Sequence, residues 1–110
     1  MAQSAIRYKD NTRYIQDSLL GEVLREIFEV TDNKITENPI KYGWLIEAIH
    51  EWWGDFEDMP PGLKDIDLDK WLIDHGRISD LEEILNIAQD KVDMKIHLEI
   101  IKFIEVLKVK

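Results

Sequence analysis

The 110-residue chain contains no cysteine. This absence excludes a disulfide framework, a zinc site built on thiolates and a cysteine nucleophile. The chain also has no apolar run approaching the roughly 20 residues that a membrane span needs, and its N-terminus lacks the apolar core of a secretory signal. We therefore expect a cytoplasmic protein whose fold depends on core packing.

Basic side chains are scarce. Lys and Arg number 14 against 23 Asp and Glu, which gives a net charge of −9. Residues 31–90 alone carry 15 acidic and 5 basic side chains. This balance argues against direct binding of nucleic acid or an anionic membrane, because both need cations to neutralise phosphates. The complementary partner is a basic protein, since opposed potentials speed encounter. In the alternative interpretation, the acidity serves solubility alone.

Length and apolar content predict one domain over residues 1–110. The chain is 45% hydrophobic and has ten aromatic residues, enough to build a core. Apolar residues recur at three- and four-residue intervals in several segments, which is typical of amphipathic helices. We therefore predict an all-α fold, a compact bundle of four to five helices preceded by a loosely ordered lead-in over residues 1–11.

Capping residues set the expected limits of the first two helices. The first is expected to begin after a cap at Asn11 or Thr12 and to end at residues 31–33. The second is expected to begin with Asn38 as its cap and Pro39 in its first turn, and to end near residue 54. Residues 55–62 contain two prolines and a glycine, so we predict a loop there.

Three shorter segments follow. A short helix is expected from about Asp65 or Asp67 to Gly76, which can take the left-handed conformation at a helix end. Ser79-Asp-Leu-Glu82 has capping-box form and predicts the start of the next helix. Residues 92–109 alternate like a strand, but their length and lack of turn residues favour a helix, with a strand as the alternative.

No motif in the chain predicts catalysis, a metal or a cofactor. Glu47 and His50 have the spacing of a di-iron ligand pair, but the second motif and the further glutamates of such a site are missing. Residues 65–69 resemble the start of a calcium loop, yet Lys70 and Gly76 replace its glycine and terminal glutamate. We expect a non-enzymatic protein without cofactors.

The most distinctive segment runs from Trp52 to Gly62, where aromatic residues adjoin an acidic, proline-containing stretch. Adjacent helical tryptophans diverge by about 100°, so one of the pair is expected to reach the surface. Tryptophan is enriched in binding hot spots, and nearby carboxylates suit a basic partner. The candidate partner-binding residues are Glu47, Glu51, Trp53, Asp55, Phe56, Glu57 and Asp58. Alternatively, both tryptophans are core, with Phe56 and Met59 closing a helix pair.

Small size, acidity, absence of cysteine and an acidic loop beside aromatics resemble the bacterial immunity proteins that neutralise nuclease toxins, of the colicin or contact-dependent-inhibition type. Met59-Pro60-Pro61-Gly62-Leu63, followed by Lys70-Trp71 and His75-Gly76, is similar to the proline-glycine entry, tryptophan and terminal glycine of colicin immunity chains. In this chain the segment lies mid-sequence, and the family's paired-tyrosine-proline element is missing. The resemblance implies a helical inhibitor of a toxin nuclease.

Three other functions stay open. A mimic of nucleic acid would also be acidic, but it would inhibit a DNA-binding protein. A helical adaptor or subunit, forming a homodimer through the apolar C-terminal segment, would need no inhibitory role. A small metal-dependent enzyme would have to use Glu47 and His50. The immunity or inhibitor function is the primary prediction.

Overall fold

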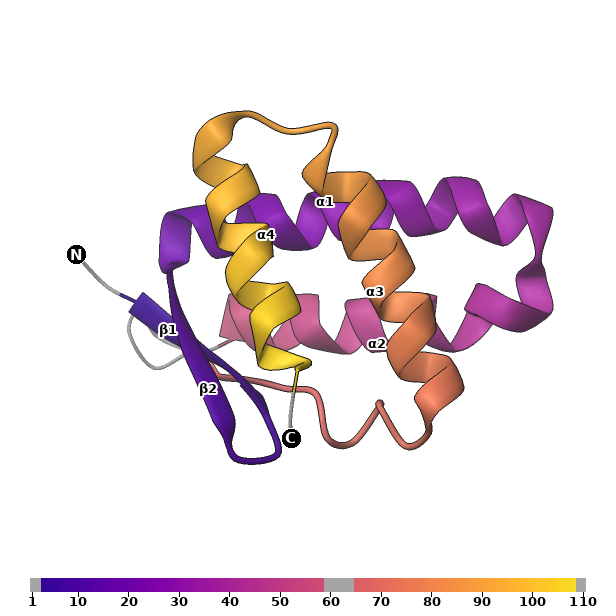
Figure 1. Cartoon of the computed structure of the whole chain (residues 1–110), viewed down its shortest axis with the longest axis horizontal. Helices are drawn as coiled ribbons and strands as arrows, with labels where there is room; N and C mark the ends of the chain where they lie inside the picture. The colour runs from indigo at the N-terminus through magenta and orange to yellow at the C-terminus, as the bar shows by residue number, and fades with distance from the viewer. Residues whose placement is uncertain (1–2, 59–64, 109–110) are drawn as a thin grey trace.

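A computed structural model describes residues 3–58 and 65–108 (Figure 1). The prediction of an all-α fold is wrong, because the helices are joined by a small three-stranded sheet and the fold is mixed α/β. In chain order the elements are β1 (Gln3–Tyr8), β2 (Asn11–Gln16), α1 (Asp17–Glu37), α2 (Pro39–Asp58), β3 (Asp65–Asp67), α3 (His75–Gln89) and α4 (Met94–Val106).

A β-hairpin occupies the expected lead-in and the expected start of the first helix. β1 pairs antiparallel with β2 and parallel with β3, so the strand order is β2-β1-β3. Ser4, Ile6 and Tyr8 are buried whereas Arg7 is exposed, which is the two-residue period of a strand. Residues 3–11 are therefore part of the fold, and α1 begins at Asp17 rather than after residue 12.

The hairpin turns at Lys9, whose backbone lies in the left-handed region with φ of 53°. This conformation costs a residue with a Cβ roughly 1–2 kcal/mol, while glycine loses about 0.5–1 kcal/mol more chain entropy on folding. We expect Lys9→Gly to raise the free energy of unfolding by up to about 1 kcal/mol, measured by urea denaturation. Lys9→Ala, the matched control, keeps the Cβ and should bring no gain; a gain as large as that of Lys9→Gly would contradict the strain argument.

The third strand stands where a short helix was predicted. Ile66 and Leu68 are fully buried, while Asp67 and Asp69 are exposed. The Leu68 N–H donates to the carbonyl of Arg7 at 2.9 Å and so extends the pairing of β3 with β1. The alternation of apolar and acidic residues is thus a strand signal, and the prediction of a helix from residue 65 to residue 76 is wrong.

α1 and α2 form an antiparallel helical hairpin with a single residue between them. Asn38 donates its N–H to the Lys34 carbonyl at 3.0 Å, and its side-chain oxygen accepts the Lys41 N–H at 3.2 Å. The predicted cap of α2 is confirmed. α1 continues past the predicted end at residues 31–33, because Thr31 is buried within it and donates its hydroxyl to the Ile27 carbonyl at 2.7 Å.

The ends of the other helices also differ from the predictions. α2 continues to Asp58, so residues 55–58 are helical; the rest of the predicted loop, residues 59–62, lies outside the described residues. α3 begins at His75, capped by Asp74, whose carboxylate accepts the Arg77 N–H at 2.8 Å. The predicted capping box at residues 79–82 is therefore wrong, and Gly76 lies in the first turn of α3 instead of ending a helix.

The helix predicted for the C-terminal segment is confirmed, and its strand alternative is wrong. α4 runs from Met94 to Val106, and the Asp93 carboxylate caps it by accepting the Ile96 N–H at 3.2 Å. Its alternating sequence nevertheless builds one apolar face, which buries Ile100 and Phe103.

The helices pack in two layers. α3 and α4 cross one side of the α1–α2 hairpin, and the sheet lies at the end of the hairpin opposite its turn (Figure 1). Buried apolar side chains from the helices and the sheet form one cluster. Trp52 is fully buried there, with its ring centroid 6.3 Å from that of Phe103. Trp52 therefore belongs to the core.

Candidate binding surface

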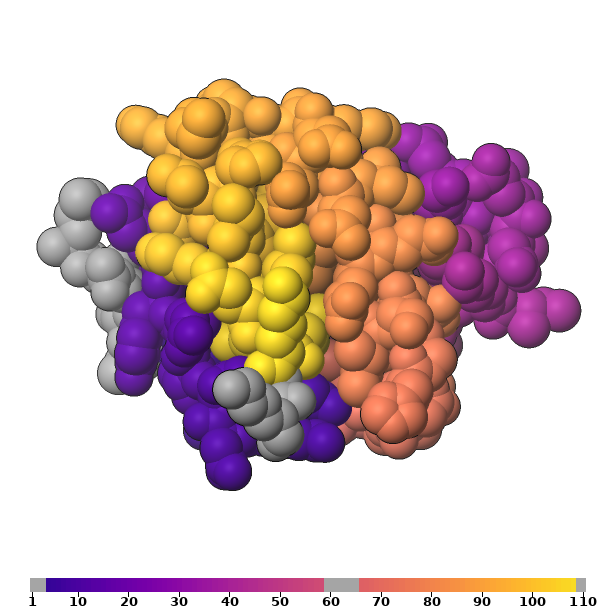
Figure 2. Space-filling view, viewed as in Figure 1, coloured from indigo at the N-terminus to yellow at the C-terminus, as the bar shows by residue number. Residues whose placement is uncertain are grey.

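The negative charge is concentrated on one structural unit. α1 and α2 together carry 11 acidic and 3 basic side chains, against 12 and 11 in the rest of the chain. Nearly all of the net charge therefore belongs to the helical hairpin. α3 and α4 cover the face of the molecule seen in Figure 2, and they hide much of the hairpin from that side. The hairpin's other face is where its charge can meet a partner.

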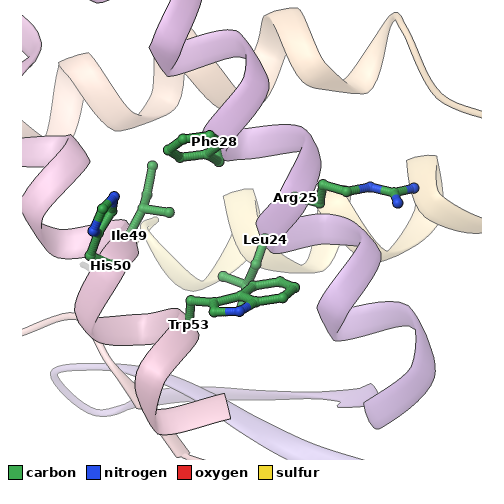
Figure 3. Close-up of a pocket in the computed structure, with 6 residues that line it drawn as sticks. All are labelled: Leu24, Arg25, Phe28, Ile49, His50 and Trp53. Atoms are coloured by element: carbon green, nitrogen blue, oxygen red, sulfur yellow. The ribbon is translucent and has the colours of Figure 1, made fainter. Parts of the chain in front are cut away.

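An apolar pocket lies between the two acidic helices. Its volume is about 350 Å³, and the described residues that line it are Leu24, Arg25, Phe28, Ile49, His50 and Trp53. All six come from α1 and α2, and α3 and α4 lie behind these helices in Figure 3. The Arg25 side chain points away from the pocket (Figure 3), toward Glu22, which it pairs with at 2.6 Å. The pocket itself is therefore lined mainly by aromatic and aliphatic groups.

Three rings from the two helices shape this pocket. Phe28 and Trp53 remain 36% and 37% exposed, far more than the core side chains. The Phe28 ring lies 6.0 Å from the imidazole of His50, and the Trp53 ring lies 5.5 Å from that of Phe56. These rings therefore pack against the fold on one side and remain partly open to solvent on the other.

Phe56 supports the pocket rather than reaching outward. Its side chain is partly buried and packs against the core cluster. A Cβ added at Gly21 of α1 would lie 3.1 Å from the Phe56 ring, closer than ordinary van der Waals contact. The glycine therefore lets the ring settle between the two helices. Of the two predicted aromatic anchors, Trp53 lines the pocket and Phe56 holds the helices beneath it.

The predicted acidic residues fall into two groups according to their contacts within the fold. Glu51 accepts hydrogen bonds from the Lys70 ammonium and, at 2.5 Å, from the Trp71 indole N–H. The hydrogen bond to Glu51 is the main cause that raises the pKa of the Lys70 ammonium, and the negative charge of Asp55 adds a smaller effect in the same direction. These two carboxylates fasten the segment after β3 to α2. They are engaged within the protein, so the prediction that they contact a partner gains no support from their positions.

Carboxylates of α3 are engaged by polar side chains of α2. Near the start of α2, the Tyr42 hydroxyl donates to Glu83 of α3, and Lys41 lies 3.5 Å from the same carboxylate. Asp80 of α3 accepts the Trp44 indole N–H at 3.3 Å. A row of polar contacts therefore joins α2 to α3, and the carboxylates there are satisfied within the fold.

Glu47, Glu57 and Asp58 behave differently. All three are exposed, and no ion pair within residues 3–58 and 65–108 involves them. Glu29 and Asp32 of α1 are likewise exposed and form no such ion pair. These five carboxylates, which have no ionic partner among the described residues, supply negative charge on the two helices that line the pocket.

Glu51 makes the stability of the fold depend on pH. Its hydrogen bonds to Lys70 and Trp71 hold its carboxyl pKa below the usual value near 4.3. The ionised carboxylate therefore stabilises the fold above the unfolded pKa, and this contribution is lost as the pH falls through the folded pKa. We expect Glu51→Gln to be less stable than wild type at pH 7 and to lose less stability on acidification from pH 5 to pH 3. Urea midpoints measured across this range test the difference.

Glu47→Gln is the matched control for that experiment, because Glu47 lies one turn away on α2 and forms no ion pair among the described residues. It is expected to follow the wild-type profile. If both variants gave the same profile, the pairing of Glu51 with Lys70 and Trp71 would have no energetic weight.

Sequence reasoning identified Trp53 but missed Phe28 as a surface residue. Phe28 continues the apolar stripe of α1, so its spacing alone does not separate it from the buried Leu24 and Ile27. His50, considered above only as a possible metal ligand, lies beside Phe28 in the pocket. Of the segments compared with colicin immunity chains, residues 59–63 lie outside the described residues, whereas Lys70-Trp71 follow β3 and His75-Gly76 begin α3.

Comparisons of the chain with protein-family models, curated proteins and solved structures returned no match. Functional conclusions therefore depend on the surface itself. Among the described residues, no helix has both the length and the apolar character needed to cross a membrane.

Proposed function

We propose that this chain is an inhibitor, of the immunity-protein kind, that binds a basic protein partner through the outer face of the α1–α2 hairpin. One observation carries the proposal: a half-open aromatic pocket lies between two helices that hold 11 acidic and only 3 basic side chains. An apolar centre with a charged surround is the usual anatomy of a protein interface. The acidic surround selects a partner rich in Lys and Arg.

A nuclease domain is the partner class that best fits this chemistry. Its nucleic-acid-binding surface must be basic to neutralise phosphates. A hairpin that presents unpaired carboxylates can occupy such a surface and exclude the nucleic acid. The proposed role is to neutralise a toxin that carries such a nuclease domain, in the cytoplasm. This role needs no catalytic group or cofactor on this chain.

Two linked experiments test the proposal. The first identifies proteins retained by the immobilised chain at low salt and released at high salt. The second expresses each basic candidate in a susceptible host, with and without this chain, and measures both growth and nuclease activity. The proposal expects a candidate that degrades nucleic acid and arrests growth, with both effects abolished by stoichiometric amounts of this chain.

Two outcomes would reject it. If a retained basic protein keeps its nuclease activity in the complex, the chain is an adaptor rather than an inhibitor. If the retained protein is a DNA-binding regulator without nuclease activity, the nucleic-acid mimic becomes the better description. Trp53→Ala separates the pocket from the charge, because it removes the pocket's tryptophan and leaves every charge in place. It should lose most of its affinity for the partner.

A further inference from the structure

Two glycines lie within α2 where no contact inside the described fold explains them. Gly43 and Gly54 are both inside the helix, where glycine is less favourable than alanine. A Cβ added at either position would meet no atom within 4 Å among the described residues. This contrasts with Gly21, where the Phe56 ring fills the space. Neither Gly43 nor Gly54 is needed for packing within the described structure.

The two glycines lie on the same side of α2 as the pocket. Gly43, His50 and Gly54 follow one another at intervals of seven and four residues, which places them on one helix face. His50 lines the pocket, with Trp53 on the adjoining face. The outer surface of α2 therefore lacks a side chain at Gly43 and at Gly54, which lie before and after His50 along the helix. A partner's backbone can approach closely where side chains are absent.

The pocket is local: its lining residues span Leu24–Phe28 of α1 and Ile49–Trp53 of α2. α1 and α2 have 21 and 20 residues, about 30 Å each, so a helix laid along α2 over the pocket could pass both Gly43 and Gly54. The pocket volume of about 350 Å³ exceeds the roughly 150 Å³ cavity that accommodates benzene, so it can receive at least one large side chain. Helix-in-groove recognition places apolar anchors at three- and four-residue intervals and leaves the remaining positions to the rim.

We propose that the groove between α1 and α2 receives an amphipathic basic helix of the partner, with a large apolar side chain inserted between Phe28 and Trp53 and its backbone close to Gly43 and Gly54. The basic character of that helix rests on the proposed function and on Glu47, Glu57 and Asp58 of α2, which are exposed and form no ion pair among the described residues. The glycines and the pocket favour close backbone approach and one apolar anchor independently of the charge.

The first test uses two synthetic 18-residue peptides of equal charge. One carries Leu at helical three- and four-residue intervals and Lys at most other positions; in the second, alanine replaces each leucine, so helicity and charge are kept. Calorimetric titration is expected to show at least about tenfold tighter binding of the leucine peptide, and Trp53→Ala is expected to remove most of that difference. Equal binding of the two peptides would overturn the proposal, since charge alone would then explain it.

The second test places side chains where the helix is proposed to lie. Gly43→Leu and Gly54→Leu should fold, because both positions face open space and leucine favours helix. Their melting temperatures should equal or exceed that of wild type, while affinity for the leucine peptide falls by about tenfold or more. Asn86→Leu, on the exposed surface of α3, is the matched control and should leave the affinity unchanged. Undiminished affinity in both glycine variants would overturn the proposal.

The outcomes separate this inference from the proposed function. If a nuclease is captured and inhibited but binds Gly43→Leu and Gly54→Leu as it binds wild type, the helix-docking inference fails and the inhibitor function stands. If the peptide results hold but no nuclease is inhibited, the groove is a helix receptor of another function. If sedimentation shows a dimer that Gly54→Leu dissociates, the occupant is a second copy of this chain, and the proposal of a basic partner helix is overturned.

Discussion

Replacing Trp52 by alanine is expected to lower the free energy of unfolding by about 3–5 kcal/mol, whereas the same replacement at Trp53 should cost about 1 kcal/mol. Trp52 is fully buried against Phe103, and its loss leaves a cavity at the point where α2 meets α4. Trp53 is 37% exposed, so its removal opens the pocket further without creating an enclosed void.

This contrast has a plain readout. Domains of this size are stable by roughly 5–15 kcal/mol, so a loss of about 3–5 kcal/mol removes a large part of the stability and should lower the melting temperature of Trp52→Ala strongly. Thermal and urea denaturation followed by circular dichroism would measure both variants under one condition. Trp52→Ala should therefore show the larger loss of stability. Trp53→Ala, which still folds, should nevertheless lose most of its affinity for a partner. Equal stability losses in the two variants would contradict the division of the pair between core and surface.

Reversing the unpaired charge is the second large expected effect. We expect the triple variant Glu47→Lys, Glu57→Lys and Asp58→Lys to slow association with a basic partner by about 10- to 100-fold at low salt. The three carboxylates are exposed and form no ion pair among the described residues, so their charge acts mainly on the approaching partner. Stopped-flow association rates across a salt series would measure the effect. The triple variant should also show a weaker dependence of the association rate on salt concentration than wild type.

A second triple variant provides the control for net charge. Asp10→Lys, Glu82→Lys and Asp90→Lys make the same total change in charge but lie outside α1 and α2. Steering depends on where charge is placed as well as on its sum, so this variant should associate several-fold faster than the first. Identical rates in the two variants would show that the protein's net charge, and not the hairpin surface, governs encounter.

The helical part of the fold could be predicted from the sequence because its signals are local. Asn38 and Pro39 mark the start of α2, and the apolar spacing of α4 identified a helix despite strand-like alternation. The sheet was missed because its signals are short. The hairpin turns at Lys9 without the glycine or asparagine that usually reveals such a turn, and β3 has three residues whose pairing with β1 lies about 60 positions away.

The candidate site was predictable in composition but not in arrangement. The divergence of adjacent tryptophans indicated that one of them would reach the surface, and the predicted one, Trp53, lines the pocket. The sequence could not reveal that Glu51 is held by Lys70 and Trp71, because those contacts join segments nearly 20 residues apart. Phe28 lines the pocket only because α1 packs against α2, which the sequence pattern of α1 does not reveal. Tertiary contacts therefore decide which acidic and aromatic side chains remain available.

The Asn11 side chain connects the hairpin turn of the sheet to the end of α4. Its amide donates to the carbonyl of Val106 at 3.3 Å, a contact between residues 95 positions apart. During synthesis, β1, β2 and the α1–α2 hairpin leave the ribosome well before α4 exists to cover them. The nascent chain must then keep the indole of Trp52 from meeting other apolar surfaces until Phe103 has been made. The abundant carboxylates of α1 and α2 would repel neighbouring nascent copies during that interval, which gives the acidic hairpin a use before any partner is present.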